Sequence, residues 1–175
     1  FRADLRKSKD VLEQVTGAPV SAFRAPSFSI TKKSLWALEI LVEEGIQHDS
    51  SIYPVYHDRY GIPGAPLEPY RIRTPSGDLT EFPASVYQIA RYCLPVAGGG
   101  YFRLYPYQFT AHCVRSINRS GRAVNLYLHP WEFDPEQPRI AGASRMSRFR
   151  HYVNLRSTRR KFSRLLGVAP VGRLG

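Results

Sequence analysis

The feature that most constrains the fold is an alternation of helix and strand patterns in the first third of the chain. Apolar residues at helical spacing predict a helix over residues 1–15, followed by a short strand at 20–23. A second amphipathic pattern predicts a helix over 32–44, and a further strand follows at 47–51. This alternation is typical of parallel strands joined by helical crossovers, so we expect an α/β fold.

The middle of the chain changes in composition. Residues 54–69 are rich in proline, glycine and tyrosine and predict a long ordered loop. Two strand patterns on either side of the turn sequence at Pro75 then predict a β-hairpin over 70–82. The glycines at 98–100 permit a close backbone approach or a positive φ. Fourfold apolar spacing predicts a helix over 106–119, and another is expected near 157–166.

A histidine follows the best candidate for a buried strand. The apolar run at 123–128 predicts a strand, and Pro130 ends it because proline cannot donate to a sheet ladder. His129 therefore lies at the strand exit, directly before Trp131 and Glu132. Ligands of α/β folds bind at the carboxyl ends of strands. The residues alone leave two interpretations open: a functional base, or a histidine whose ring is satisfied at the edge of a core.

The chain is basic, with a formal net charge of +11 over 175 residues. Much of the excess lies late, in Arg145, Arg148, Arg150, Arg156, Arg159, Arg160, Lys161, Arg164 and Arg173. We interpret these residues as a solvated basic face. No zinc-finger spacing or aromatic RNA-binding signature accompanies the charge, so no nucleic-acid partner is expected.

The two cysteines, Cys93 and Cys113, lack CxxC spacing, and the sequence leaves their pairing open. No apolar run reaches the length of a bilayer span, and no signal-peptide pattern is present. The chain begins at Phe1 and its only methionine is Met146, so we expect a piece of a longer protein.

Three motifs in order point to a known family. They are Phe23-Arg24-Ala25-Pro26-Ser27-Phe28, Asp49-Ser50-Ser51 and Leu126-Tyr127-Leu128-His129-Pro130-Trp131-Glu132. Together they resemble the polysaccharide deacetylases of carbohydrate esterase family 4, in particular the bacterial subgroup linked to exosortase-type exopolysaccharide loci. Members of that subgroup carry a C-terminal extension, and the runs at 98–103 and 147–154 look like it. The resemblance covers nearly the whole chain.

The resemblance implies a fold and an activity. Residues 1–135 would be the C-terminal portion of a distorted (β/α)7-type barrel with an added β-hairpin, and residues 136–175 a basic extension packed on that barrel. The enzyme would be a hydrolase of non-peptide carbon–nitrogen bonds that removes N-acetyl groups from a polysaccharide. A divalent metal, zinc in many members, would activate water. A bacterial cytoplasmic and a periplasmic location both stay open.

The resemblance also assigns roles to individual residues. His129 would protonate the leaving amine, and Arg24 would orient the catalytic aspartate. Leu128 would line the pocket for the acetyl methyl group, Ser27 would offer its backbone N–H to the oxyanion, and Asp49 would belong to the substrate-binding set. Further candidate substrate-binding residues are Tyr101, Arg103, Trp131 and Glu132, for which packing is the alternative. His57 and Asp58 are candidates for a second metal or base site.

Two motifs of the family are missing from this chain. The family's early Asp-Asp motif and its HxxxH pair precede the arginine motif, and none of the five histidines here has HxxxH spacing. We therefore expect no metal ligands in this chain and no activity from it alone. An incomplete barrel would leave an open edge that invites self-association. The alternative function is a non-catalytic remnant that binds a polysaccharide or another polyanion.

Overall fold

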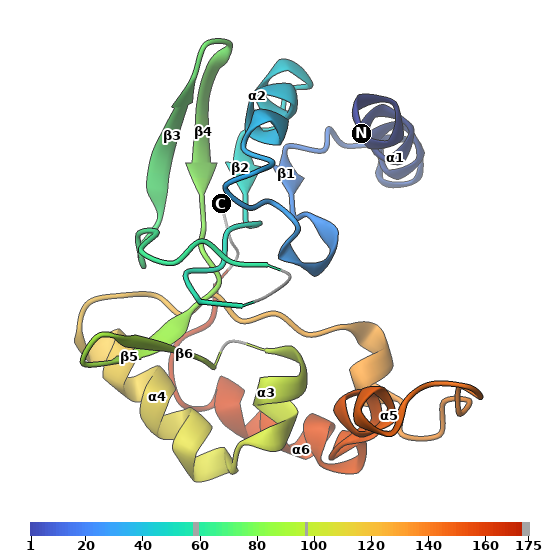
Figure 1. The fold of residues 1–175 in the computed structure, drawn as a ribbon, viewed down its shortest axis with the longest axis vertical. Coiled ribbons are helices and arrows are strands. Elements are labelled where there is room, and N and C mark those ends of the chain that lie inside the picture. Colours follow the sequence, from blue (N-terminus) through green and yellow to red (C-terminus); the bar gives the residue numbers. More distant parts are fainter. Residues whose placement is uncertain (58–59, 97, 173–175) are drawn as a thin grey trace. The chain divides into compact units, whose positions relative to one another are not determined.

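The computed structural model of the chain describes residues 1–57, 60–96 and 98–172. These residues form two compact units, Phe1–Ala84 and a second unit that starts at Ser85 (Figure 1). The sequence suggested a boundary at 135/136, whereas the contacts divide the structure between Ala84 and Ser85. Residues 136–172 share the second unit with residues 85–135.

The first unit carries a four-stranded sheet with the order β1-β2-β4-β3. Its elements are α1 (Arg2–Thr16), β1 (Ala22–Phe23), η1 (Pro26–Phe28), α2 (Trp36–Glu43), β2 (His48–Asp49), β3 (Tyr70–Thr74) and β4 (Gly77–Glu81). Strands β1, β2 and β4 are parallel, and β3 pairs with β4 in an antiparallel hairpin. The predicted crossover and hairpin are both confirmed. The chain is thus mixed α/β, and in the part that the structure describes the sheet does not close into a barrel.

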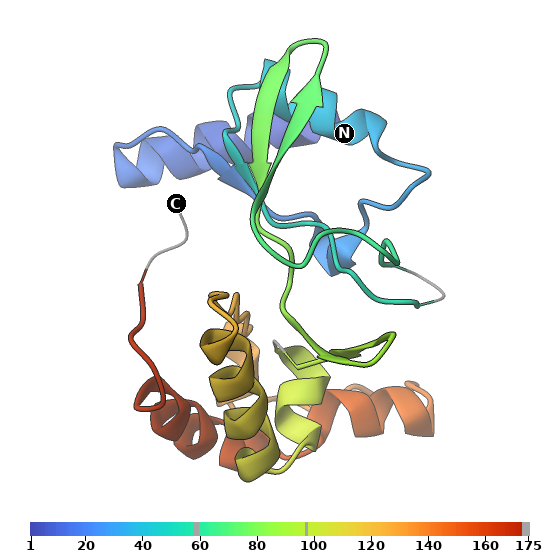
Figure 2. The ribbon, with the colours of Figure 1, turned by 90° about the vertical axis from the view of Figure 1, so that its left-hand side faces the viewer.

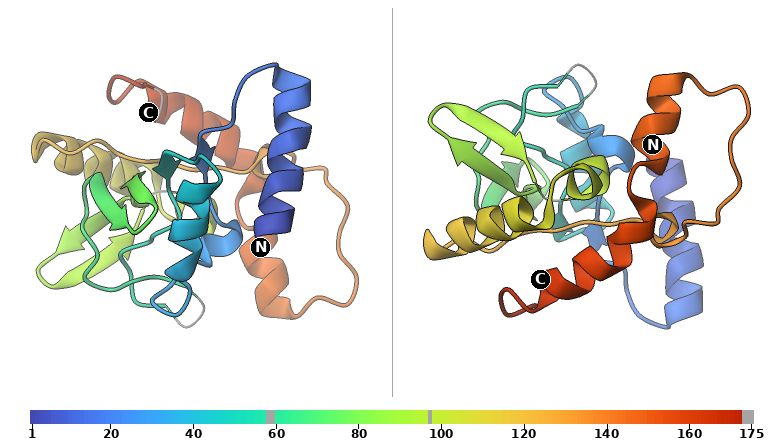
Figure 3. Two further views of the ribbon diagram at one scale, coloured as in Figure 1. Left: turned by 90° about the horizontal axis from the view of Figure 1, so that it is seen from above. Right: turned by 90° about the horizontal axis from the view of Figure 1, so that it is seen from below.

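Helix α2 covers the sheet and contributes Ala37, Leu38 and Leu41 to the apolar core of this unit (Figure 2). Leu38 and Leu41 of α2 are buried against Leu79 of β4. The helix begins later than predicted, because residues 31–34 form a turn in which the Thr31 N–H donates to Ser34 Oγ at 2.9 Å. Helix α1 lies beside α2 (Figure 3), held by the Arg6 guanidinium on both oxygens of Glu44 at 2.7 and 2.8 Å.

The second unit is mainly helical. Its elements are β5 (Val86–Ile89), β6 (Tyr92–Pro95), α3 (Gly99–Leu104), α4 (Tyr107–Arg119), η2 (Pro130–Phe133), α5 (Arg145–Tyr152) and α6 (Leu155–Leu166). Strands β5 and β6 form a separate antiparallel pair. Phe102, Val114 and Leu165 meet in its core, which joins α3, α4 and α6. The expected helices near 106–119 and 157–166 are confirmed, whereas β5, β6, α3 and α5 were not predicted.

The strand predicted at 123–128 is wrong in one respect. The segment is extended, and within the residues that the structure describes it makes one isolated parallel bridge, from Tyr127 to Gly98, rather than a named strand. Helix α3 begins directly after Gly98. A side chain at Gly98 would overlap the carbonyl oxygen of Tyr127, so this contact requires glycine. The apolar residues of the segment, Val124, Leu126 and Leu128, pack on the helical core instead.

Two smaller points concern the cysteines and the membrane. Cys93 and Cys113 are both free thiols, and burial raises the pKa of Cys113 to about 11. Within the described residues, none of the helices has the length and apolar character that a bilayer crossing requires.

Candidate functional site

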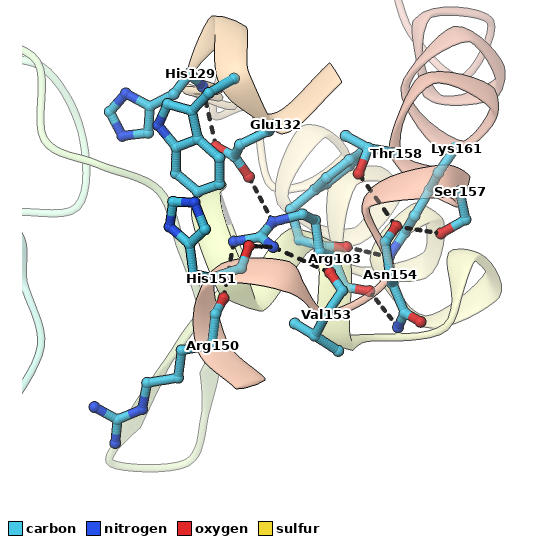
Figure 4. A network of polar contacts seen from close by, with 12 residues as sticks. Arg103, His129, Glu132, Arg150, His151, Val153, Asn154, Ser157, Thr158 and Lys161 are labelled. Carbon is cyan, nitrogen blue, oxygen red and sulfur yellow. Dashed lines mark hydrogen bonds and ion pairs between the residues drawn. The ribbon is translucent and has the colours of Figure 1, made fainter. Parts of the chain in front are cut away.

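In the second unit, His129 is an exposed side chain on a fixed backbone (Figure 4). It occupies the N-cap position of η2, and its backbone N–H donates to Glu132 Oε1 at 3.0 Å. Its ring is nearly parallel to that of Trp131, with centroids 5.8 Å apart, and contacts the Tyr127 ring edge-on. The strand-exit position that the sequence indicated thus presents a titratable ring to solvent from a backbone with defined hydrogen bonds.

Glu132 is held by a buried ion pair with Arg103 of α3. The Glu132 side chain has no exposed surface, and Arg103 is 3% exposed. Arg103 Nε donates to Glu132 Oε2 at 2.8 Å, so both carboxylate oxygens of Glu132 accept hydrogen bonds. A buried carboxylate with a charged partner and two donors is the arrangement that compensates the cost of burying the charge.

Arg103 also binds the C-terminal segment (Figure 4). Its Nη1 donates to the carbonyl oxygens of His151 and Val153 at 2.7 and 3.0 Å, and its Nη2 donates to that of Arg150 at 3.0 Å. One guanidinium therefore joins α3, η2, the last turn of α5 and Val153. Together with the packing of Phe162 and Leu165 on the helical core, it ties residues 136–172 to the second unit.

A stack of rings continues from His129 through Trp131 to His151. The Trp131 and His151 rings are nearly parallel, with centroids 4.3 Å apart. Arg103 lies 5.1 Å from the Trp131 centroid, and His151 Nε2 hydrogen-bonds Gln137 Oε1 at 2.8 Å. The extension thus supplies one ring of the wall beside His129.

The other residues expected in this unit have different surroundings. Leu128 is half-buried and packs on the helical core. Tyr101 is half-buried and its ring contacts that of Tyr105. The side chains of Arg103 and Glu132 are buried in their mutual ion pair, so any effect of theirs on chemistry at His129 acts through the position of that residue.

In the first unit, Arg24 and the Asp49 motif are adjacent because β1 and β2 are parallel neighbours. Arg24 Nε donates to the Ser50 carbonyl oxygen at 3.0 Å, and its Nη2 donates to Ser50 Oγ at 2.7 Å. Ser50 Oγ in turn donates to the Phe82 carbonyl oxygen at 2.6 Å. The first two sequence motifs therefore meet at the carboxyl ends of β1, β2 and β4.

The turn at Ser27 has an uncommon backbone. Ser27 and Phe28 have φ values of 56° and 52°, a left-handed conformation that residues other than glycine rarely adopt twice in succession. Such conformations persist only where the surroundings impose them, and they cluster at functional sites. Here the buried Phe28 ring packs against Tyr53, with centroids 4.9 Å apart, and leaves Ser27 exposed.

Asp49 of β2 lies beside a second buried carboxyl group, that of Glu81 on β4. Asp49 and Glu81 are register partners on β2 and β4, and neither has exposed surface. Asp49 Oδ1 accepts from Ser51 Oγ at 2.6 Å, and Glu81 Oε1 accepts from the Ile52 N–H at 3.0 Å. Within the described residues, Asp49 Oδ2 and Glu81 Oε2 are buried and have no hydrogen-bond partner.

This pair retains a proton at neutral pH. Burial, and then the charge of Asp49, raises the pKa of Glu81 to about 9, and burial also raises the pKa of Asp49. Two neighbouring buried carboxyls do not both ionise readily, so the pair shares one proton at neutral pH. Asp49 was expected to contact substrate, but its burial allows it to act only by supporting its neighbours.

The described residues do not fit a metal centre. Among them, no three side chains of His, Cys, Asp or Glu gather in a way that would hold an ion. Asp49 and Glu81 offer two carboxyls, which already accept from Ser51 Oγ and the Ile52 N–H, whereas a structural or catalytic metal needs three or four ligands. Of the suggested second site, Asp58 lies outside the described residues, and His57 stacks on Tyr60 at 3.8 Å.

Sequence reasoning missed Glu81 and His151. Glu81 follows Leu79 by two residues on β4, so period-two alternation places both on the buried face, and that alternation was an available signal. His151 shows no comparable signal, because its contact with Trp131 depends on how the extension folds back.

Residues 50–173 match a family described as a domain of unknown function (DUF3473), a range that covers more than half of the chain. No curated protein and no solved structure matches the chain.

We predict that Glu81→Gln flattens the dependence of stability on pH. Folded Glu81 keeps its proton up to about pH 9, whereas an unfolded glutamate loses it near 4.5. The free energy of unfolding therefore falls as pH rises between these values, by up to about 1.4 kcal/mol per pH unit. Urea unfolding from pH 5 to 9 measures the slope. An equal slope in E81Q and in the unmodified chain would contradict the shared proton.

We predict that Arg103→Ala lowers the free energy of unfolding by about 3–5 kcal/mol, because it leaves Glu132 charged and unpaired in the interior. Arg148→Ala is the matched control, since Arg148 is exposed on α5 and its loss is worth about 0.5 kcal/mol or less. Chemical denaturation compares the two variants. Similar values for both would show that the buried pair does not hold the unit together.

Proposed function

This chain belongs to the DUF3473 family, and we propose that it is the C-terminal part of a metal-dependent polysaccharide deacetylase. The enzyme would remove N-acetyl groups from an amino-sugar polymer in bacterial exopolysaccharide metabolism. The resemblance of three ordered motifs to carbohydrate esterase family 4 supports this proposal. Under it, the parallel strands β1, β2 and β4 form part of a distorted (β/α)7-type barrel.

The observation that carries the proposal is the state of His129. The His129 ring is exposed, and the backbone N–H of His129 donates to Glu132. The Glu132 carboxylate is itself fixed by Arg103. A general acid needs a titratable group near neutral pH and a defined position, and a histidine on a backbone anchored by a buried ion pair meets both needs.

The proposed chemistry is hydrolysis of an amide. The oxygen of water adds to the acetyl carbon, the carbon–nitrogen bond breaks, and acetate and a free amine result. The His129 imidazolium donates its proton to the leaving nitrogen. The Ser27 N–H, presented by the left-handed turn, donates to the oxyanion, and Leu128 contacts the acetyl methyl group. Arg24 holds the carboxylate of the base.

The metal and the base belong to motifs that precede the arginine motif in the family. A divalent ion there, zinc in many members, would make hydroxide available at neutral pH. We propose that both reside in sequence upstream of this chain, and that the open sheet edge at β1 makes the isolated chain prone to self-association.

In the protein that includes its upstream sequence, we predict that His129→Ala lowers kcat on partially acetylated glucosamine polymers by about 10²–10⁴-fold. The limb of the pH–rate profile that reports the acid should vanish. His112→Ala is the control, because His112 is an exposed histidine on α4 of the same unit. If the two variants deacetylate equally well, His129 is not the proton donor.

The 175-residue chain by itself should release no acetate from the same polymers with zinc present, because it contributes the acid and not the base. Acetate release is measured over hours at high protein concentration. Metal-dependent turnover by the isolated chain would show that the chemistry is assigned to the wrong residues.

A further inference from the structure

The second unit contains a groove that the proposed chemistry does not use. Its volume is about 340 Å³, and it lies between one face of α6 and the segment that links α3 to α4. Its walls are formed by Arg103, Leu104, Tyr105, Pro106 and Tyr107 on one side and by Asn154, Ser157, Arg160, Lys161 and Arg164 on the other. A groove of this size is suited to a single sugar ring.

The electrostatics of the groove are one-sided. Among the described residues that line it, four are basic and none is acidic. Two of the four have structural duties: Arg103 binds Glu132, and buried Lys161 donates to the carbonyl oxygens of Phe102 and Tyr105. The other two, Arg160 and Arg164, are exposed on α6 and are available to a ligand.

The two exposed guanidiniums differ in how far they are already positioned. Arg164 lies over the ring of Tyr107, 3.9 Å from its centroid, which restricts its conformers before any ligand arrives. Arg160 makes no hydrogen bond or ion pair with any other described residue. A guanidinium binds a carboxylate through two parallel hydrogen bonds, a geometry that an ammonium group does not offer.

We propose that this groove binds a carboxylated sugar unit of an acidic polysaccharide. The preference for an anion follows from the exposed guanidiniums of Arg160 and Arg164 and from the absence of acidic side chains among the described residues that line the groove. The choice of a saccharide among anionic polymers rests on the proposed function. Nucleic acid is disfavoured, because single-strand binding uses successive aromatic platforms, whereas the Tyr107 ring here is occupied by Arg164.

The groove is distinct from the site around His129. Figure 4 shows Asn154, Ser157 and Lys161 on one side of Arg103 and His129 on the other. The groove therefore serves as an accessory subsite that holds the polymer away from the reacting N-acetyl group. It extends the proposed substrate from an amino-sugar polymer to one that also carries uronic acid units.

The test is a binding measurement on the 175-residue chain with oligogalacturonate, by calorimetry at about 50 mM salt, where charged contacts are only partly screened. Arg160→Ala with Arg164→Ala should weaken binding about tenfold or more, because it removes two charge-assisted contacts. Arg145→Ala with Arg148→Ala is the matched control, since it removes two exposed arginines from α5, outside the groove. That control should change affinity less than threefold.

Three outcomes overturn the proposal. Equal weakening in both double variants would mean diffuse attraction to a basic surface. Equal affinity for a neutral chito-oligosaccharide would mean that the anion is not recognised. Tighter binding of single-stranded DNA of the same charge would point to nucleic acid. Arg160→Ala alone should give part of the loss. The readout is binding without turnover. A negative binding result would therefore overturn the groove proposal and leave the deacetylase proposal standing, and a failed activity test would leave the binding result standing.

Discussion

The second unit depends on the buried pair of Arg103 and Glu132. Arg103 extends from the short helix α3 and satisfies one carboxylate and three carbonyl oxygens, which belong to segments far apart in the sequence. Burying such a pair is rarely a source of net stability relative to an apolar alternative. We expect its effect here to be specificity, because the Glu132 carboxylate and the carbonyl groups of Arg150, His151 and Val153 must come together around one guanidinium. The orientation of the His129 backbone follows from that arrangement.

The first unit also buries acidic side chains, but there a retained proton rather than a cation lowers the charge. Asp49 and Glu81 face each other across parallel strands in a position closed to solvent. A basic partner is not required, because Ser51 Oγ and the Ile52 N–H each donate to one oxygen of the pair, and a retained proton lowers the charge of the pair. Above this pair, Arg24 and Ser50 join the ends of β1, β2 and β4. These hydrogen bonds and the buried carboxyl pair together fix the geometry of the parallel strand ends.

Local patterns predicted part of this structure and tertiary contacts decided the rest. Periodicity predicted α1, α4, the parallel strands and the β3–β4 hairpin, because each is set by residues close in sequence. It overstated the run at 123–128, since an apolar extended segment looks like a strand whether or not a partner runs beside it. It could not show that Arg103 and Glu132 are buried, because they meet each other, and Arg103 meets residues 150–153, only in the folded chain. Motif order indicated His129, Arg24 and Asp49, while the environment of each came only from the structure.

The single bridge between Gly98 and Tyr127 has a consequence for local motion. A strand within a ladder opens only when several neighbouring hydrogen bonds break together, whereas a segment held at separate points opens between them at little cost. The residues that lead to His129 are anchored where the Asn125 N–H donates to Ser85 Oγ at 2.8 Å, at the bridge to Gly98 and at Glu132, with apolar packing between. We expect amide exchange in this segment to depend on these attachment points rather than on a cooperative ladder.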